Sequence, residues 1–181
     1  SDLLPTGEAV LLARNDCAYS ASGQATSEVH VVNVENGLPS IAVSLPVEGT
    51  IQESRMVGDA LYVVSQQYRP RRVNGQDVYE WGSVVSSYDL SNPTQPLIKS
   101  SLWHPGWGNV VTATDRFLFV ATQDAGNWWR SVVHCVDVSS PDGTMKALAS
   151  IRSDGRVPDK FKINVQGDVL TIISENWNTS G

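Results

Sequence analysis

The segment that most constrains the fold is SRMVGDALYVVSQ, at residues 54–66. It predicts a strand, a tight turn at Gly58-Asp59 and a second strand of large apolar residues. Three related segments occur: Gly7-Glu8 precedes AVLLAR, Thr114-Asp115 precedes RFLFVA, and Gly167-Asp168 precedes VLTIIS. The four acidic residues are 51, 56 and 53 positions apart, a spacing typical of repeat architectures.

A second motif alternates with the first. The segments EVHVVNVENG, SVVSSYDLSNP and SVVHCVDVSSP align on Asn33, Asp89 and Asp137, and each precedes a polar turn and another strand. The strands of the first motif are apolar at nearly every position, so we expect them to be covered on both faces. Four short strands in about fifty residues are typical of one blade of a β-propeller.

The expected fold is therefore an all-β propeller built from four-stranded antiparallel blades. The predicted boundaries are residues 9–45 for the last three strands of a first blade, 52–102 and 109–151 for two complete blades, and 160–175 for the first two strands of a fourth. About three blade-equivalents do not close a ring. We therefore expect a partial ring whose partner is the rest of a longer chain or another protein; a β-sandwich is the alternative fold.

Two long passages carry a family resemblance. PSIAVSLPVEGTIQESRMVGDALYVVS and SVVHCVDVSSPDGTMKALASIRSDGRVPDKFKINVQGDVLTIIS resemble the bacterial and archaeal secreted β-propeller domain family, which is distantly related to WD-repeat propellers. SSYDLSNPTQPLIKSSL is similar to a short repeat of such propellers. The resemblance implies a propeller that is secreted, periplasmic or on the cell surface, with no assigned chemistry. The first residues, SDLLP, contain no signal peptide and look like the start of a processed chain.

Charge and motif content exclude several function classes. The net charge is −6, with 13 basic and 19 acidic residues, which argues against a nucleic-acid partner. The one basic cluster, Arg69-Pro70-Arg71-Arg72, is expected in a loop. Apolar runs of about five or six residues are too short to cross a membrane. No nucleophile elbow, zinc-protease motif or phosphate-binding loop is present, so the sequence predicts no catalytic residue, metal or cofactor and favours a non-enzymatic protein.

The cysteines and acidic residues have structural interpretations. Cys17 and Cys135 are far apart and match no metal-binding spacing, and both a disulfide and two buried thiols remain open. Glu8, Asp59, Asp115 and Asp168 are interpreted as hairpin-turn residues rather than general acids. Asp89 and Asp137 are interpreted as Asx-type turn formers; a calcium site at residues 137–142 needs more oxygen donors than this short turn offers.

The three histidines divide into two groups. His30 and His134 occupy equivalent positions, three before Asn33 and Asp137, which favours a structural role. His104 belongs to the segment WHPGWG, which is expected to be a loop, where a histidine can act as an acid, a base or a ligand. No partner residue can be named for it, so a structural role is favoured here as well.

The six tryptophans define the candidate site. In a four-stranded antiparallel blade, the connections between second and third strands lie on the same face as those between successive blades. All six tryptophans fall in such connections, including Trp177. Three readings stay open: anchors for long loops, a protein-binding surface, or a glycan-binding surface. The predicted binding residues are Tyr79, Trp81, Trp103, His104, Trp107, Trp128 and Trp129.

The sequence thus predicts an exported, non-enzymatic propeller that acts as a protein-interaction or scaffold module through an aromatic-rich loop face. The alternative is a propeller enzyme or lectin-like module acting on polysaccharide. An enzyme of that kind needs a pair of carboxylates or a metal on the same face or in the central channel.

Overall fold

The computed structural model describes residues 3–6, 9–19, 25–35, 38–108 and 110–176, with side chains from Ala25 onward except Glu35. These residues form strands, turns and a single 3₁₀ turn, Lys160–Lys162 (η1), and contain no α-helix. The prediction of an all-β fold with four-stranded antiparallel sheets is confirmed. Within the described part of the chain, no helix has the length and apolar character needed to span a membrane.

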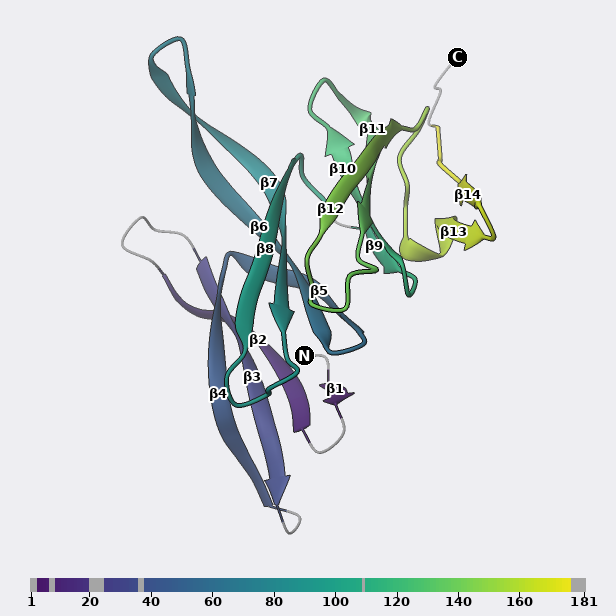
Figure 1. The fold of residues 1–181 in the computed structure, drawn as a ribbon. Coiled ribbons are helices and arrows are strands. Elements are labelled where there is room, and N and C mark those ends of the chain that lie inside the picture. Colours follow the sequence, from purple (N-terminus) through teal and green to yellow (C-terminus); the bar gives the residue numbers. More distant parts are fainter. Residues whose placement is uncertain (1–2, 7–8, 20–24, 36–37, 109, 177–181) are drawn as a thin grey trace.

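The strands form three four-stranded sheets and one hairpin, each in simple sequence order (Figure 1). The first sheet contains β1 (Leu3–Thr6), β2 (Ala9–Tyr19), β3 (Ala25–Glu35) and β4 (Leu38–Glu48). The second contains β5 (Thr50–Val57), β6 (Ala60–Val73), β7 (Gln76–Asp89) and β8 (Leu97–Pro105). The third contains β9 (Val110–Ala113), β10 (Phe117–Asp124), β11 (Asn127–Asp137) and β12 (Lys146–Arg152). The hairpin contains β13 (Ile163–Gln166) and β14 (Val169–Ile172).

The first sheet has one strand more than the sequence predicted. We expected three strands in residues 9–45, but β1 precedes them and pairs with β2 from Leu3↔Leu12 to Thr6↔Ala9. The sequence signal for β1 is weak because the strand is only four residues long and contains Pro5. Proline is tolerated here because β1 is the edge strand of its sheet.

Three apolar clusters lie between successive sheets. One joins β3 and β4 to β6 and β7, through Val29, Val31, Leu61 and Val63 among others. The second joins the β5–β8 sheet to the β9–β12 sheet, and the third joins the β9–β12 sheet to the β13–β14 hairpin. The sheets therefore pack face to face in sequence order, but the described residues do not close into a ring.

Strand β6 shows why this packing suits the sequence. Residues 60–65 are all buried, so the expectation of a strand covered on both faces is confirmed. Leu61 and Val63 pack toward the β1–β4 sheet, whereas Tyr62 and Val64 pack toward the β9–β12 sheet. Successive side chains of a strand point to opposite faces, so a continuous apolar run is needed in this inner strand.

The sequence alignment of the third sheet was wrong by one residue. Ala60 pairs with Asp89 at the start of β6, and Phe117 pairs with Asp137 at the start of β10. The turn before β10 therefore consists of Asp115-Arg116, and the residue equivalent to Ala60 is Phe117. The sequence alignment had instead made Arg116 equivalent to Ala60. Thr114 closes this turn, since its backbone N–H donates to Phe117 O over 2.8 Å.

This register determines which side chains of β10 face each neighbouring sheet. Leu118 and Val120 pack against the β5–β8 sheet, while Phe119 and Ala121 pack toward the β13–β14 hairpin. A slip of one residue moves every side chain to the opposite face of a strand. The sequence pattern did not detect it because β10 is apolar at consecutive positions.

All three large sheets contain a β-bulge at the same place. The register shifts between Val31 and Val32 in β3, between Ser87 and Tyr88 in β7, and between Cys135 and Val136 in β11. In each sheet the shift leaves one residue of the fourth strand (β4, β8 or β12) without a Cα partner. These residues are Ala42, Lys99 and Leu148.

The turns after β7 and β11 have the predicted chemistry. Asp89 Oδ1 accepts a hydrogen bond from Ser91 N, and Asp137 Oδ1 accepts one from Ser139 N, both over 2.9 Å. The pKa of the Asp89 carboxyl is lowered by its hydrogen bonds from Ser91, and that of Asp137 by the hydroxyl and then the backbone N–H of Ser139. The Asx-turn prediction is therefore confirmed for Asp89 and Asp137.

The longest feature of the fold is the outer part of the β6–β7 hairpin, called here the arm (residues 67–82). It extends beyond the β5–β8 sheet in Figure 1. Asn74 and Gly75 form its two-residue turn, with φ of 51° and 82°, as a type I′ turn requires. The sequence prediction of a loop at residues 69–72 is therefore wrong: these residues belong to β6. Pro70 fits because β6 has only one neighbour in the arm.

Candidate functional site

Two hairpins and one strand end form the candidate site. The arm and the β10–β11 hairpin extend to the same side of the molecule in Figure 1. The end of β8 and the segment after it lie between them: Gly106 N donates to Trp81 O in the arm, and Gln123 N donates to Trp107 O from β10. The backbone of Gly106 and Trp107 thus bonds to both hairpins.

Exposed aromatic rings run from the arm toward this junction. Tyr68 stacks on Tyr79 with ring centroids 5.2 Å apart, and it also contacts Trp81 at 4.8 Å. Trp81 in turn meets Trp107 edge to face at 4.7 Å. We call these rings, together with those of the β10–β11 hairpin, the aromatic face. Its members are Tyr68, Tyr79, Trp81, Trp107, Trp128 and Trp129.

The outer end of the aromatic face is highly exposed. The side chains of Trp128 and Trp129 are 74% and 66% exposed, at the start of β11. Both residues were predicted to lie in a loop, but they are part of the strand. The nearby turn is held by Asp124, which accepts from Gly126 N over 3.0 Å, and by Asn127, whose side chain accepts from Trp129 N over 3.0 Å.

Trp103 has a different role from the other predicted rings. It lies in β8, is half-buried, and carries the guanidinium of Arg69 over its ring at 3.4 Å. Trp103 also lies so close to Gly82 that a Cβ on Gly82 would overlap the indole. Trp103 therefore packs the base of the arm onto β8, which corresponds to the anchoring interpretation.

His104 is buried rather than part of an exposed loop. It lies in β8, and its ring stacks on His134 of β11 with centroids 4.2 Å apart. Burial lowers the pKa of His104 to about 4, and burial together with the neighbouring His104 lowers that of His134 to about 4. The Nε2 atom of His104 is buried and makes no hydrogen bond to the described residues.

A chain of hydrogen bonds fixes His134. Thr122 Oγ1 donates to Pro105 O over 3.0 Å and lies 3.2 Å from His134 Nε2, while Ser150 Oγ lies 2.9 Å from His134 Nδ1. A tautomer with the proton on Nε2 satisfies all three groups. The chain connects the end of β8 to β10, β11 and β12. It therefore supports the junction beneath the aromatic face.

His30 repeats part of this arrangement. Its Nδ1 lies 2.8 Å from Ser44 Oγ in the neighbouring strand, as His134 Nδ1 lies beside Ser150. The equivalence inferred from the sequence is therefore present in the contacts, and a structural role accounts for both residues.

A hollow opens where the aromatic face meets the junction. Its volume is about 210 Å³. Its walls are Glu80, Trp81, Pro105, Gly106, Trp107, Gln123, Asp124, Ala125 and Trp128. Three of the predicted tryptophans therefore share one space. Trp129 is not among the lining residues, although it is adjacent to Trp128 in the sequence.

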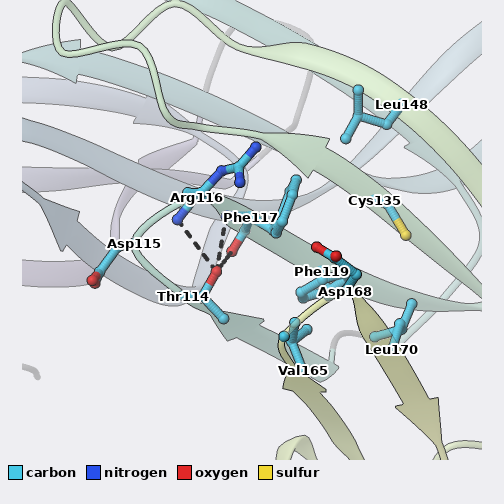
Figure 2. Close-up of a pocket in the computed structure, with 11 residues that line it drawn as sticks. Thr114, Asp115, Arg116, Phe117, Phe119, Cys135, Leu148, Val165, Asp168 and Leu170 are labelled. Carbon is cyan, nitrogen blue, oxygen red and sulfur yellow. Dashed lines mark hydrogen bonds between the residues drawn. The ribbon is translucent and has the colours of Figure 1, made fainter.

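A second pocket lies between the β9–β12 sheet and the β13–β14 hairpin (Figure 2). Its volume is about 460 Å³, and its lining includes Phe117, Phe119, Cys135, Leu148 and Leu170. Thr114 Oγ1 closes one end by accepting from Arg116 N and Phe117 N. Burial raises the pKa of the free Cys135 thiol, which disfavours the nucleophilic thiolate.

The corresponding space between the two preceding sheets is filled by protein. There Val138 and Met145, from the segment between β11 and β12, pack beside Ala60 and Tyr62. Tyr62 also donates to Val138 O over 3.2 Å. The pocket in Figure 2 is therefore interpreted as uncovered packing surface rather than as a catalytic cleft.

No family model matches the chain, and no curated protein or solved structure shows significant similarity to it. The site is therefore interpreted from its own geometry. Among the described residues, no three His, Cys, Asp or Glu side chains are grouped so that they could hold a metal ion.

The sequence predicted most of the aromatic face but missed Tyr68 as a site residue. The pair Asn74-Gly75 was the available signal, because a type I′ turn there fixes Tyr68 opposite Trp81. His104 and Trp103 belong to the support rather than to the exposed surface. Cys17 and Trp177 lie outside the side chains that the structure describes.

Proposed function

We propose that the chain is a section of a β-propeller. The face-to-face packing of successive sheets and the shared bulges at Val31, Ser87 and Cys135 support this architecture. In a propeller, the pocket of Figure 2 would be filled in the way that Val138 and Met145 fill the space beside Ala60 and Tyr62. Export to the periplasm, the cell surface or the medium is part of the proposal and rests on the family resemblance alone.

The proposed activity is non-enzymatic recognition of a protein partner through the aromatic face. One observation carries the proposal: the rings of Tyr79, Tyr68, Trp81 and Trp107 contact one another in series and yet remain 40–56% exposed. Large, partly exposed aromatic rings are enriched at protein interfaces, where a few of them carry most of the binding energy.

The surrounding structure prepares these rings for binding. The paired strands of the arm hold Tyr68 and Tyr79, and the hydrogen bonds of Gly106 and Gln123 hold Trp107. Ordering before association reduces the conformational entropy lost on binding. Immobilising an interface built on hairpins therefore costs less conformational entropy than immobilising one built on loose loops.

Affinity capture with the folded protein tests this proposal, followed by titration of the purified captured partner. Replacing Tyr79 or Trp129 with Ala is expected to weaken binding about tenfold or more without lowering the unfolding midpoint. Phe161→Ala is the matched control, because Phe161 is 83% exposed on η1, outside the aromatic face. Equal binding by all three variants contradicts a protein-binding role for this face.

Carbohydrate binding is the second candidate function. It is favoured by Trp128 and Trp129, two strongly exposed indoles next to each other at the start of a strand. Such rings offer apolar surfaces on which sugar rings stack. Binding to a polysaccharide that is lost in Trp128→Ala and Trp129→Ala, with no protein captured, would favour this candidate.

A further inference from the structure

The hollow between the arm and the β10–β11 hairpin has an unusual lining. Three indoles from separate parts of the chain, Trp81, Trp107 and Trp128, surround about 210 Å³ together with the carboxylate residues Glu80 and Asp124. A volume of this size suits a small headgroup rather than a long chain.

The ring geometry favours a compact cation. Trp81 and Trp107 meet edge to face with their planes inclined at 78°, and both line the hollow together with Trp128. The face of an indole carries negative electrostatic potential and attracts cations within about 6 Å of its centre. Several ring faces around one space attract the same ligand together, as in the aromatic cages that bind quaternary ammonium groups.

The charged residues of the lining also favour a cationic ligand. The side chains of Glu80 and Asp124 are 27% and 15% exposed, so solvent screens them only partly. Their present partners, Arg71 and Arg152, are 66% and 76% exposed, at distances of 3.4 and 3.2 Å. Because both arginine side chains are mostly exposed, another cation can compete with them for these carboxylates.

An indole beneath the aromatic face already holds a cation. Arg69 lies over the Trp103 ring at 3.4 Å, at the base of the arm. Arg69 thus lies on an indole, and Arg71 and Arg152 lie on the two carboxylates of the hollow. This arrangement fits a positively charged guest and disfavours a phosphate or carboxylate ligand.

We propose that the hollow lined by Trp81, Trp107 and Trp128 binds an alkylated ammonium group. The group enters with its methyl substituents against the indole faces and its charge near Glu80 and Asp124. Such a group can belong to a methylated lysine side chain or to a choline-type headgroup. For its biological meaning the inference rests on the proposed function, because it names the chemistry that the aromatic face recognises.

The direct test uses tetramethylammonium chloride and the intact chain, with no protein partner. The indole N–H signals of the tryptophans are followed by NMR during titration, and sodium chloride keeps ionic strength constant. The signals of Trp81, Trp107 and Trp128 are expected to shift together, while that of Trp129 does not. The neutral analogue 2,2-dimethylpropan-1-ol, of similar shape, is expected to bind at least about tenfold more weakly.

Matched variants locate the site. Trp128→Ala is expected to weaken tetramethylammonium binding about tenfold, whereas Trp129→Ala changes it less than about twofold. The double variant Glu80→Gln with Asp124→Asn removes both charges at nearly constant volume and is expected to weaken binding severalfold. The same double variant should leave binding of the neutral analogue unchanged.

Two further titrations distinguish a methylated lysine side chain from a choline-type headgroup as the source of the ammonium group. One compares choline with a peptide containing trimethyllysine, and the other compares that peptide with its unmodified lysine form. Equal affinity for the neutral analogue, or shifts produced by methyl glucoside but not by tetramethylammonium, overturns the inference. The protein-binding proposal survives that result if Tyr79→Ala still weakens the partner, so the two failures are distinguishable.

Discussion

The imidazole of His104, at the end of β8, stacks on the imidazole of His134 in β11, with ring centroids 4.2 Å apart. This pair joins the β5–β8 sheet to the β9–β12 sheet directly beneath the junction that carries Trp107. Both rings are buried, and both have a pKa of about 4. The contact is therefore one between two neutral rings.

We expect stability to decrease between about pH 6.5 and pH 4. In this range the unfolded chain binds protons at both histidines while the folded chain does not, so the free energy of unfolding falls as the pH is lowered. A pKa difference of about 2.5 corresponds to about 3 kcal/mol for one histidine. Urea unfolding at a series of pH values measures this slope.

The variant His104→Leu tests whether this histidine pair causes the dependence of the free energy of unfolding on pH. It removes one titrating ring together with its unpaired Nε2 atom, and so the number of protons taken up on unfolding should fall by about one. An unchanged slope in His104→Leu would mean that other groups cause the acid sensitivity.

The hydroxyl of Thr122 offers a second prediction. Thr122→Val keeps the shape of the side chain but leaves Pro105 O and His134 Nε2 without their partner, so we expect destabilisation of about 1–3 kcal/mol. Thr122→Ser retains the hydroxyl and is the control. Denaturant unfolding of both variants distinguishes loss of the hydrogen bonds from loss of one methyl group.

The sequence predicted the fold class and strand order well because the physical signals are local. The apolar run of β6 and the turn residues Gly58, Asp89 and Asp137 each specify a short piece of structure. The register of β10 was wrong because its turn, Asp115-Arg116, lacks the glycine that marks the turn before β6. Only pairing with β11, which is distant in sequence, determines that register.

The candidate site was predicted less well than the fold. Grouping the tryptophans on one face required only the order of the strands, and the structure brings Trp81, Trp107 and Trp128 to one hollow. Distinguishing exposed rings from supporting ones depended on contacts between sheets. For this reason the sequence grouped His104 and Trp103 with the surface residues, although both lie in the support beneath it.

Close packing at the base of the arm leads to a third prediction. Gly82→Ala places a methyl group against the Trp103 indole, so we expect destabilisation of about 1–3 kcal/mol and a changed near-ultraviolet circular dichroism spectrum. Gly126→Ala is the matched control, because its nearest neighbour would be Asp124 Oδ1 at 3.6 Å. Equal stability of the two variants would contradict the close contact between β7 and β8.

The tip of the arm allows the fourth prediction, which separates the arm from the sheets. Gly75 has φ of 82°, a conformation that β-branched residues strongly avoid, so Gly75→Val should open the turn. Amide hydrogen exchange is expected to accelerate in residues 69–80 but to remain slow in residues 60–65, which are buried between two sheets.

This variant also tests how the aromatic face depends on the arm. If the paired strands order Tyr68 and Tyr79, then Gly75→Val should weaken partner binding while the unfolding midpoint of the sheets changes little. Gln76→Ala, one residue further on, is the control, since its exposed side chain can be removed without a change of backbone conformation. Faster exchange that spreads into β6 at residues 60–65 would show instead that the arm and the sheet unfold as one unit.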